Sequence, residues 1–430
     1  MSFKKSSYAA LAATISLASG TADATNGYFR LGYSANSIAM GGASTATAQD
    51  ALAGASNPAL ALNTDVNYTL AASIFAPDRG FTVEGGNPMT AQPGEFALMP
   101  QDTTSDSHYF VIPSFGYNRK IDEDFAVNVS VYANGGMNTD YSESVFYAGE
   151  TGVDLSQLFV STSFAYKVAE TTHLGIAPIV AGQRFKARGL SSFGADPSGG
   201  TIPGLENGYS KDNTKLSDNQ YDYSFGYGAR IGIWQGINDN WSVGASYQSE
   251  IRFQEFEKYE GLFAENGAFN VPETYNLGLE FTRNNYTVAL DYQRINYSDV
   301  QSVGNPMLPA LSPGSLGTDG GPGFGWQDMS VYELGIAIDG ASDNTYRFGV
   351  SYGEQPIPSS EVLFNILAPG VQEWHFTAGY EFGVNDVDYA FALMYSPSKK
   401  VKGRNPLLQS QEQTIELEMS QIELTFGANF

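Results

Sequence analysis

Long runs of strictly alternating apolar and polar residues constrain the fold of this chain more than any other feature. In "YDYSFGYGARIGI", residues 221–233, every odd position is aromatic or aliphatic, and every even position is polar or glycine. Successive side chains of a β-strand point to opposite faces, so this run is predicted to have one wholly apolar face. Residues 241–253 and 387–395 show much the same alternation. The pattern predicts an all-β fold.

The length of these runs favours a membrane barrel over a soluble sandwich. Strands in soluble proteins average about 5–6 residues, whereas a tilted strand needs about 9–11 residues to cross a bilayer. Tyr and Trp often stand at the ends of the runs, as expected for the two aromatic girdles of an outer-membrane barrel. We predict fourteen antiparallel transmembrane strands, at residues 66–76, 108–119, 125–134, 155–168, 172–186, 220–236, 240–254, 274–283, 286–297, 328–339, 345–354, 372–383, 387–398 and 412–430.

The connections between these strands are alternately short and long. Turns such as "RKIDED" and "RNN" interleave with the long segments 77–107, 187–219 and 298–327. Short periplasmic turns and long outer loops are typical of bacterial barrels. The final run, "QIELTFGANF" at 421–430, is expected to pair with the first strand, because an open sheet edge in lipid leaves backbone groups unsatisfied.

The N-terminus and the composition indicate where the protein works. Lys4 and Lys5 precede a short apolar run and "ADA" at 22–24, which predicts a signal peptide cleaved after Ala24. The absence of cysteine excludes disulfides, and a net charge of −24 disfavours nucleic acid as a partner. The three histidines lie in no recognisable catalytic motif, so neither an enzyme, a cofactor nor a metal site is expected. We predict a multi-pass barrel in a Gram-negative outer membrane.

Between the signal and the first strand lies a segment rich in Ala, Gly, Ser and Thr, with only three charged residues. It ends in an Asn-Pro-Ala triplet, where Asn57 is a candidate helix N-cap and Pro58 the first helical residue. Small residues suit packing against a barrel wall, so a lumenal plug of short helices is favoured over a flexible linker. The predicted organisation is a signal peptide at 1–24, a hatch at 25–65 and a transmembrane β-barrel at 66–430.

This segment resembles the N-terminal hatch of FadL-type long-chain fatty acid transporters. The matching residues, in order, are Gly41, Gly42, Asp50, Asn57, Pro58 and Ala59. The resemblance implies a fourteen-strand barrel with a small helical hatch in its lumen. It also implies uptake of long-chain fatty acids or similar hydrophobic compounds, by capture at the outer loops, transfer to a lumenal pocket and lateral exit into the membrane. Some relatives take up aromatic hydrocarbons instead.

The resemblance also suggests binding residues. Arg184 and Lys186 align with a basic pair that holds the fatty-acid carboxylate; alternatively, they are strand-end cations that meet lipopolysaccharide phosphates or loop carboxylates. The family's second basic site has no counterpart in "DGGPGFGWQD", which leaves a neutral ligand open. Tyr28 aligns with an N-terminal aromatic residue that reaches the pocket. Gly135 and Gly136 align with the kink of the lateral opening, although the strand could simply end there.

The residues themselves give one further indication of the lumen. In "HYFVIPSFGY", if Tyr109 and Val111 face lipid, then Phe110 and Ile112 face inward, either into a greasy pocket or against the plug. The expected partners are a fatty acid or another hydrophobic small molecule, outer-membrane lipids and lipopolysaccharide, and the protein is expected to be a monomer. The competing interpretations are a general porin, which would lack a plug, and an aromatic-hydrocarbon channel of the same family.

Overall fold

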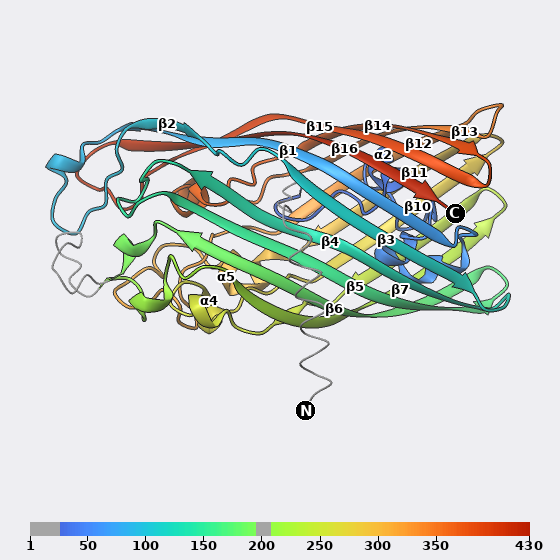
Figure 1. Cartoon of the computed structure of the whole chain (residues 1–430), viewed down its shortest axis with the longest axis horizontal. Helices are drawn as coiled ribbons and strands as arrows, with labels where there is room; N and C mark the ends of the chain where they lie inside the picture. The colour runs from blue at the N-terminus through green and yellow to red at the C-terminus, as the bar shows by residue number, and fades with distance from the viewer. Residues whose placement is uncertain (1–25, 195–207) are drawn as a thin grey trace.

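The computed structural model describes residues 26–194 and 208–430, so the predicted signal peptide at 1–24 lies outside the described residues. Antiparallel strands form one closed barrel (Figure 1). Its fourteen long strands are β1 (Tyr68–Gly85), β3 (Phe110–Lys120), β4 (Phe125–Tyr141), β5 (Thr151–Ala169), β6 (Thr172–Arg188), β7 (Asp222–Asn238), β8 (Trp241–Gln248), β10 (Thr274–Arg283), β11 (Tyr286–Ile295), β12 (Met329–Asp339), β13 (Asn344–Gly353), β14 (Trp374–Val384), β15 (Val387–Arg404) and β16 (Gln413–Asn429). Two short strands, β2 (Gln101–Thr104) and β9 (Arg252–Phe253), are additional.

The barrel closes by pairing of its last strand with its first. The β16–β1 ladder runs without a register shift from Thr69 opposite Asn429 to Gly85 opposite Gln413. Closure removes the sheet edge that lipid could not satisfy. The predicted fourteen-strand antiparallel barrel and its closing contact are confirmed.

The apolar face of the alternation points away from the lumen. In β7, Tyr227 is 73% exposed and Ile231 52% exposed, whereas Ser224 and Arg230 on the opposite face are buried. Aromatic rings pair across strands near the short turns. For example, the ring centroids of Trp241 on β8 and Phe281 on the neighbouring β10 lie 4.6 Å apart. The outer surface is therefore an apolar band bordered by aromatic side chains, as a bilayer requires.

Several strands extend further toward the long-loop end than predicted. β1 continues to Gly85 instead of ending at residue 76, and β15 continues to Arg404 instead of residue 398. Cross-strand ion pairs accompany this extension, since Lys402 Nζ lies 2.6 Å from Glu84 Oε2. The predicted loop 77–107 therefore begins inside a strand. The extra residues are held in strands by ladder pairing with the neighbouring strands, and the hydrophobic pattern of one strand does not predict this pairing.

One predicted strand is longer than the strand that the structure shows. The run 240–254 is divided into β8 and the two-residue β9, which pairs with β7 through Phe253 opposite Gly226. Ser249 donates its backbone N–H to the carbonyl of Ala229, where the chain leaves the regular ladder. The alternation is interrupted at Ser249, where Gln248, Ser249 and Glu250 form a polar run, and this interruption is the local sign of the break.

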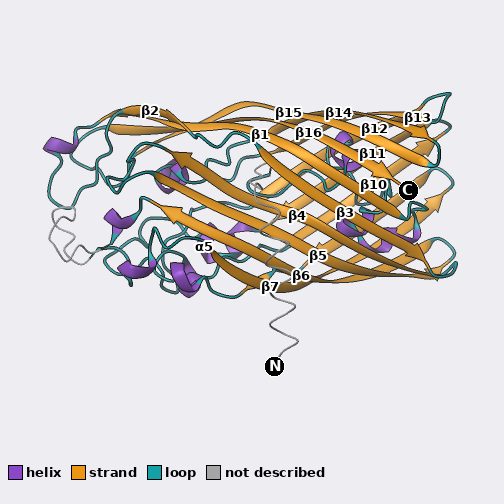
Figure 2. Ribbon diagram, in the orientation of Figure 1, coloured by secondary structure: helices purple, strands orange, loops and turns teal. Residues whose placement is uncertain are grey.

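The N-terminal segment, residues 26–65, lies within the barrel at the short-turn end (Figures 1 and 2). Its helices are α2 (Ala35–Ala39), α3 (Ala53–Ser56) and the 3-10 helix η1 (Pro58–Leu62). α2 packs on β13–β16, whereas η1 packs on β3–β7, so the segment contacts nearly opposite arcs of the wall. Asn57 caps η1 by accepting the backbone N–H of Ala59 at 3.1 Å. That the segment serves as a plug stays a prediction, as do the domain boundaries.

The remaining helical turns belong to the long loops or lie between strands. They are η2 (Pro88–Thr90), η3 (Ser191–Phe193), η4 (Asn213–Lys215), η5 (Glu257–Tyr259), α4 (Ala264–Gly267), η6 (Tyr297–Asp299), α5 (Gln301–Gly304), η7 (Ser359–Glu361) and η8 (Phe364–Ile366). Among the helices of the described ranges, none is long and apolar enough to cross a membrane.

Candidate functional site: a gap in the barrel wall and two apolar pockets

The wall is incomplete between β3 and β4. Their ladder ends at Phe115 opposite Val131, although β4 continues to Tyr141. Next to this stretch, the pairing of β4 with β5 shifts register between Ala133 and Gly136, which is a β-bulge. We call residues 132–139 of β4, which have no ladder partner on the β3 side within the described residues, the wall gap.

Gly135 and Gly136 therefore lie inside a bulged strand. The alternative that the strand ends at these glycines is excluded, because β4 pairs with β5 up to Tyr141 opposite Thr151. A Cβ added to Gly135 would lie 1.7 Å from the backbone oxygen of Tyr28. The glycine is required here because another backbone approaches it closely.

Residues from elsewhere in the chain satisfy the backbone along the gap. Phe29 forms an antiparallel bridge with Gly135, and the Arg30 N–H donates to the Asn134 carbonyl at 3.1 Å. Further along β4, Arg79 Nε donates to the Asn138 carbonyl at 2.6 Å. The gap is thus covered from the lumen by the N-terminal segment and bridged by one side chain of β1.

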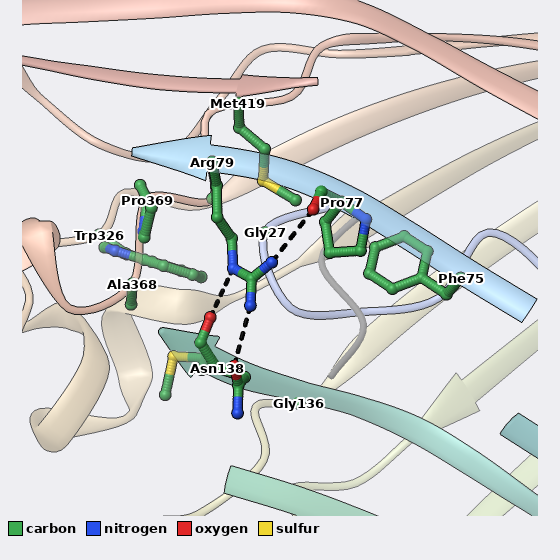
Figure 3. Close-up of a pocket in the computed structure, with 12 residues that line it drawn as sticks. Gly27, Phe75, Pro77, Arg79, Gly136, Asn138, Trp326, Ala368, Pro369 and Met419 are labelled. Carbon is green, nitrogen blue, oxygen red and sulfur yellow. Dashed lines mark hydrogen bonds between the residues drawn. The ribbon is translucent and has the colours of Figure 1, made fainter. Parts of the chain in front are cut away.

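An apolar pocket lies directly beside the gap (Figure 3). Its walls come from the N-terminal segment, β1, β4, β16 and the loops before β12 and β14. The lining residues of this gap pocket are Gly27, Phe75, Pro77, Arg79, Gly136, Met137, Asn138, Trp326, Ala368, Pro369, Gly370 and Met419. Arg79 is the only charged residue among them.

Arg79 is a site residue that the sequence did not reveal. It points inward from β1 and is 5% exposed. Its Cζ lies 5.4 Å from the ring centroid of Phe110, a position typical of a cation–π contact. The predicted first strand ended at residue 76, so Arg79 was assigned to a loop. Continued alternation with the inward-facing Phe75 and Phe81 was the signal that could have located it.

Tyr28 packs against Gly135 of the wall gap and against Trp326, but it is not among the residues that line the gap pocket. It is fully buried, with ring centroids 5.4 Å from Tyr297 and 5.8 Å from Trp326. Its backbone N–H donates to the Tyr297 hydroxyl at 3.2 Å, which in turn donates to the Asn26 carbonyl. Burial, reinforced by the neighbouring Tyr297, raises the pKa of the Tyr28 hydroxyl well above its ordinary value, so the phenol stays neutral.

A second apolar pocket lies toward the long-loop end. Its lining residues are Phe146, Val153, Phe185, Leu190, Phe193, Leu216, Leu262, Phe263, Ser302, Leu316, Pro322, Gly323, Phe324, Phe364 and Leu367. Among the described residues that line this loop pocket, none is charged. The predicted loops 187–219 and 298–327 contribute to it, whereas 77–107 does not.

Arg184 and Lys186 do not line either pocket. Both residues are an even number of positions from Ile176, so they lie on the same face of β6 as that residue, which is 52% exposed on the outer surface. The intervening Phe185 lies on the opposite face, toward the lumen. Arg184 lies 3.7 Å from the carboxylate of Asp154, and its Cζ stacks 4.7 Å from the ring centroid of the loop residue Tyr221. This geometry matches the alternative interpretation, a strand end whose cations meet carboxylates.

The other predicted residues are placed as follows. Phe110 and Ile112 are buried on the inner face. Phe110 lies behind Arg79, and neither residue lines the gap pocket or the loop pocket. Gly41 and Gly42 adopt positive φ, +68° and +95°, after α2.

Asp50 and Asn57 bond within the N-terminal segment, where Asp50 Oδ1 accepts the Leu52 N–H at 2.9 Å. The Asn57 amide donates to the carbonyls of Thr45 at 2.8 Å and Ile233 at 3.0 Å, which ties the segment to β7. Pro58 and Ala59 begin η1. None of these residues lines either pocket.

A closed fourteen-strand barrel with an apolar outer band defines an integral outer-membrane protein. The family described as outer membrane protein transport protein (OMPP1/FadL/TodX) matches residues 9–430, and the chain belongs to this family. It is accordingly an outer-membrane transporter of the FadL/TodX type, from a family that transports hydrophobic compounds, and not an enzyme. A comparison with curated proteins found no match.

Solved structures share this fold at low sequence identity. The toluene transporter TodX of Pseudomonas putida superposes with a TM-score of 0.63 at 18% identity, covering 93% of this chain and 99% of that one. A FadL homologue of Pseudomonas aeruginosa gives 0.66 at 14% identity, with 94% and 99% coverage. The toluene transporter TbuX of Ralstonia pickettii gives 0.60 at 17%, with 93% and 98% coverage. At these identities the likeness establishes the fold alone.

Proposed function

We propose that this protein takes up hydrophobic small molecules by capture in the loop pocket, transfer to the gap pocket and sideways release through the wall gap into the outer membrane. The observation that carries the proposal is the bulged stretch of β4 that does not pair with β3 and lies beside an apolar pocket. A porin for free diffusion needs neither feature. It also needs an open lumen, whereas the N-terminal segment here contacts both arcs of the wall.

Polar contacts support the role of the N-terminal segment as a hatch. Asp291 of β11 accepts the backbone N–H groups of Ser44 at 2.9 Å and Thr45 at 2.7 Å. Asn36 donates to Glu381 of β14 at 2.6 Å. Charge-assisted bonds of this kind are stronger than neutral ones, so the segment is anchored to the wall at several points. A closed short-turn end favours a lateral path over an axial one.

The lining of the loop pocket bears on the ligand class. Ser302 is the only polar side chain among its described lining residues, so the pocket suits an alkyl chain or an aromatic ring equally well. Structures with this fold include the toluene transporter TodX and a FadL homologue. Long-chain fatty acids and neutral aromatic hydrocarbons are therefore the two candidate substrates.

Deleting Gly135 tests the lateral path. The deletion removes the extra residue of the bulge, so that β4 can pair regularly with β5 and the gap narrows. We expect uptake of both radiolabelled oleate and toluene to fall strongly in cells that lack their own transporter. Deletion of Gly149, in the outer turn of the same hairpin, is the matched control, because it also shortens the hairpin by one residue but lies outside the β4–β5 ladder.

Two results would contradict the proposal. One is undiminished uptake by a Gly135 deletion variant that reaches the outer membrane folded, as judged by heat-modifiable electrophoretic mobility. The other is a steady, large single-channel conductance of the unmodified protein in planar bilayers, since that would indicate an open axial pore.

A further inference from the structure

We propose that Arg79 binds the carboxylate of an amphiphilic substrate in the gap pocket, and that the same guanidinium holds the wall gap closed until the carboxylate arrives. The inference rests on the proposed lateral path and adds to it a head-group site and a substrate class. The site is formed by Arg79 of β1 and Asn138 of β4, on opposite sides of the gap (Figure 3).

The charge of Arg79 is buried without a salt bridge among the described residues, although the carboxylates of Asp78 and Asp140 lie near enough to interact with it electrostatically. The guanidinium makes no ion pair with any carboxylate in the described part of the chain, unlike the buried Arg30, which pairs with Glu423. Its neighbour Asp78 points outward from the barrel. A buried cation that makes no salt bridge attracts an anion more strongly than an exposed one, because the surrounding medium screens it less.

All acceptors that now hold the guanidinium are neutral. Nε donates to the Asn138 carbonyl at 2.6 Å and Nη2 to the Asn138 side-chain oxygen at 2.9 Å. Nη1 donates to the carbonyls of Ser107 at 2.9 Å and Pro77 at 3.3 Å. Arginine has five N–H donors, so one donor remains without an acceptor among residues 26–194 and 208–430. Because a carboxylate can accept two parallel charge-assisted bonds, it is a better partner than the Asn138 amide.

The bonds to Asn138 also span the opening. β3, which should separate β1 from β4, pairs with β4 only up to Phe115 opposite Val131. Beyond that point the Arg79–Asn138 contact links β1 to β4 directly. A ligand carboxylate that takes over Nε and Nη2 releases Asn138, so head-group binding and loosening of the gap occur together. A neutral hydrocarbon provides no such exchange and leaves the link in place.

Trp326 makes this site measurable, because it lines the same pocket as Arg79. Quenching of its fluorescence by dibromostearate is compared with quenching by dibromostearate methyl ester, which has the same chain but no carboxylate. The full-length mature protein in detergent micelles is used. In Arg79→Met we expect affinity for the acid to fall about ten- to hundredfold, as for loss of a charge-assisted hydrogen bond, and affinity for the ester to change less than about twofold.

Two further variants sharpen the test. Asn138→Asp places a carboxylate of nearly the same shape against Arg79, so it should weaken acid binding as much as Arg79→Met does while keeping the fold. Arg184→Met is the matched control: this arginine is also buried in the wall, at 7% exposure, but lines neither pocket, so both affinities should stay unchanged. A Trp326→Phe background verifies that the signal comes from the gap pocket.

The proposal is overturned if Arg79→Met and Asn138→Asp leave acid binding unchanged, or if acid and ester weaken equally, which would indicate a packing role only. These outcomes are separable from failure of the lateral path. Loss of acid binding in Arg79→Met combined with normal uptake by the Gly135 deletion would leave the head-group site standing without the lateral exit. The reverse combination would leave the lateral exit without the head-group site.

Discussion

Gly135→Ala should detach the start of the N-terminal segment from the wall. The added Cβ would lie 1.7 Å from the Tyr28 oxygen, whereas ordinary contacts begin at 3.4 Å, so the backbone of residues 26–30 must retreat. Retreat breaks the bridge between Phe29 and Gly135 and the bond from Arg30 N–H to the Asn134 carbonyl. Overpacking costs about 1–3 kcal/mol and each lost hydrogen bond about 0.5–1.5 kcal/mol. We therefore expect a local destabilisation of about 2–4 kcal/mol.

Amide hydrogen exchange followed by mass spectrometry measures this effect locally. A destabilisation of that size corresponds to about thirtyfold or faster exchange in the peptide that covers residues 26–34.

The matched control is Gly427→Ala on β16. This glycine also faces the lumen, but a Cβ there would meet its nearest atom at 3.2 Å, a contact that a small adjustment of Ala35 relieves. Two results would refute the reasoning that the bulge needs a residue without a side chain for the N-terminal segment to dock. One is unchanged exchange in residues 26–34 of Gly135→Ala, and the other is an equal acceleration in Gly427→Ala.

Two further predictions concern the hatch and the outer face. Asn57→Ala removes the cap of η1 and the bonds to the Thr45 and Ile233 carbonyls, so it should lower stability by about 1–3 kcal/mol in thermal unfolding. The same variant should show more frequent conductance openings in planar bilayers; an unaltered trace and melting temperature would argue against an anchoring role. Replacing Arg184 and Lys186 together by Ala should leave fatty-acid affinity unchanged, because both lie on the outer face. A tenfold loss of fatty-acid affinity in the same quenching assay would show that these two residues do bind the ligand.

The sequence predicted the wall better than the site because the two depend on different information. The inward position of Phe110 and Ile112 followed from alternation with Tyr109 and Val111, which lie outside at 76% and 58% exposure. The same rule, applied to β6, would have placed Arg184 outside.

The family resemblance predicted that Arg184 binds the ligand, whereas the alternation of side chains along β6 predicts that Arg184 points away from the lumen. The structure agrees with the alternation, because Arg184 lies on the same face of β6 as Ile176 and contacts Asp154. A side chain's face in a strand is a property of its own position, whereas a motif transferred across low identity assumes a register that the chain need not keep.

By itself the sequence determined the class of fold: a two-residue period sustained over bilayer-spanning lengths leaves a closed barrel as the only way to satisfy every backbone group in lipid. Only the tertiary structure decided where that wall fails to close. The edge of β4 at residues 134–138 is completed by Phe29, Arg30 and Arg79, which lie far away along the chain. Such contacts depend on how separate segments meet inside the lumen, and no local pattern of residues encodes that meeting.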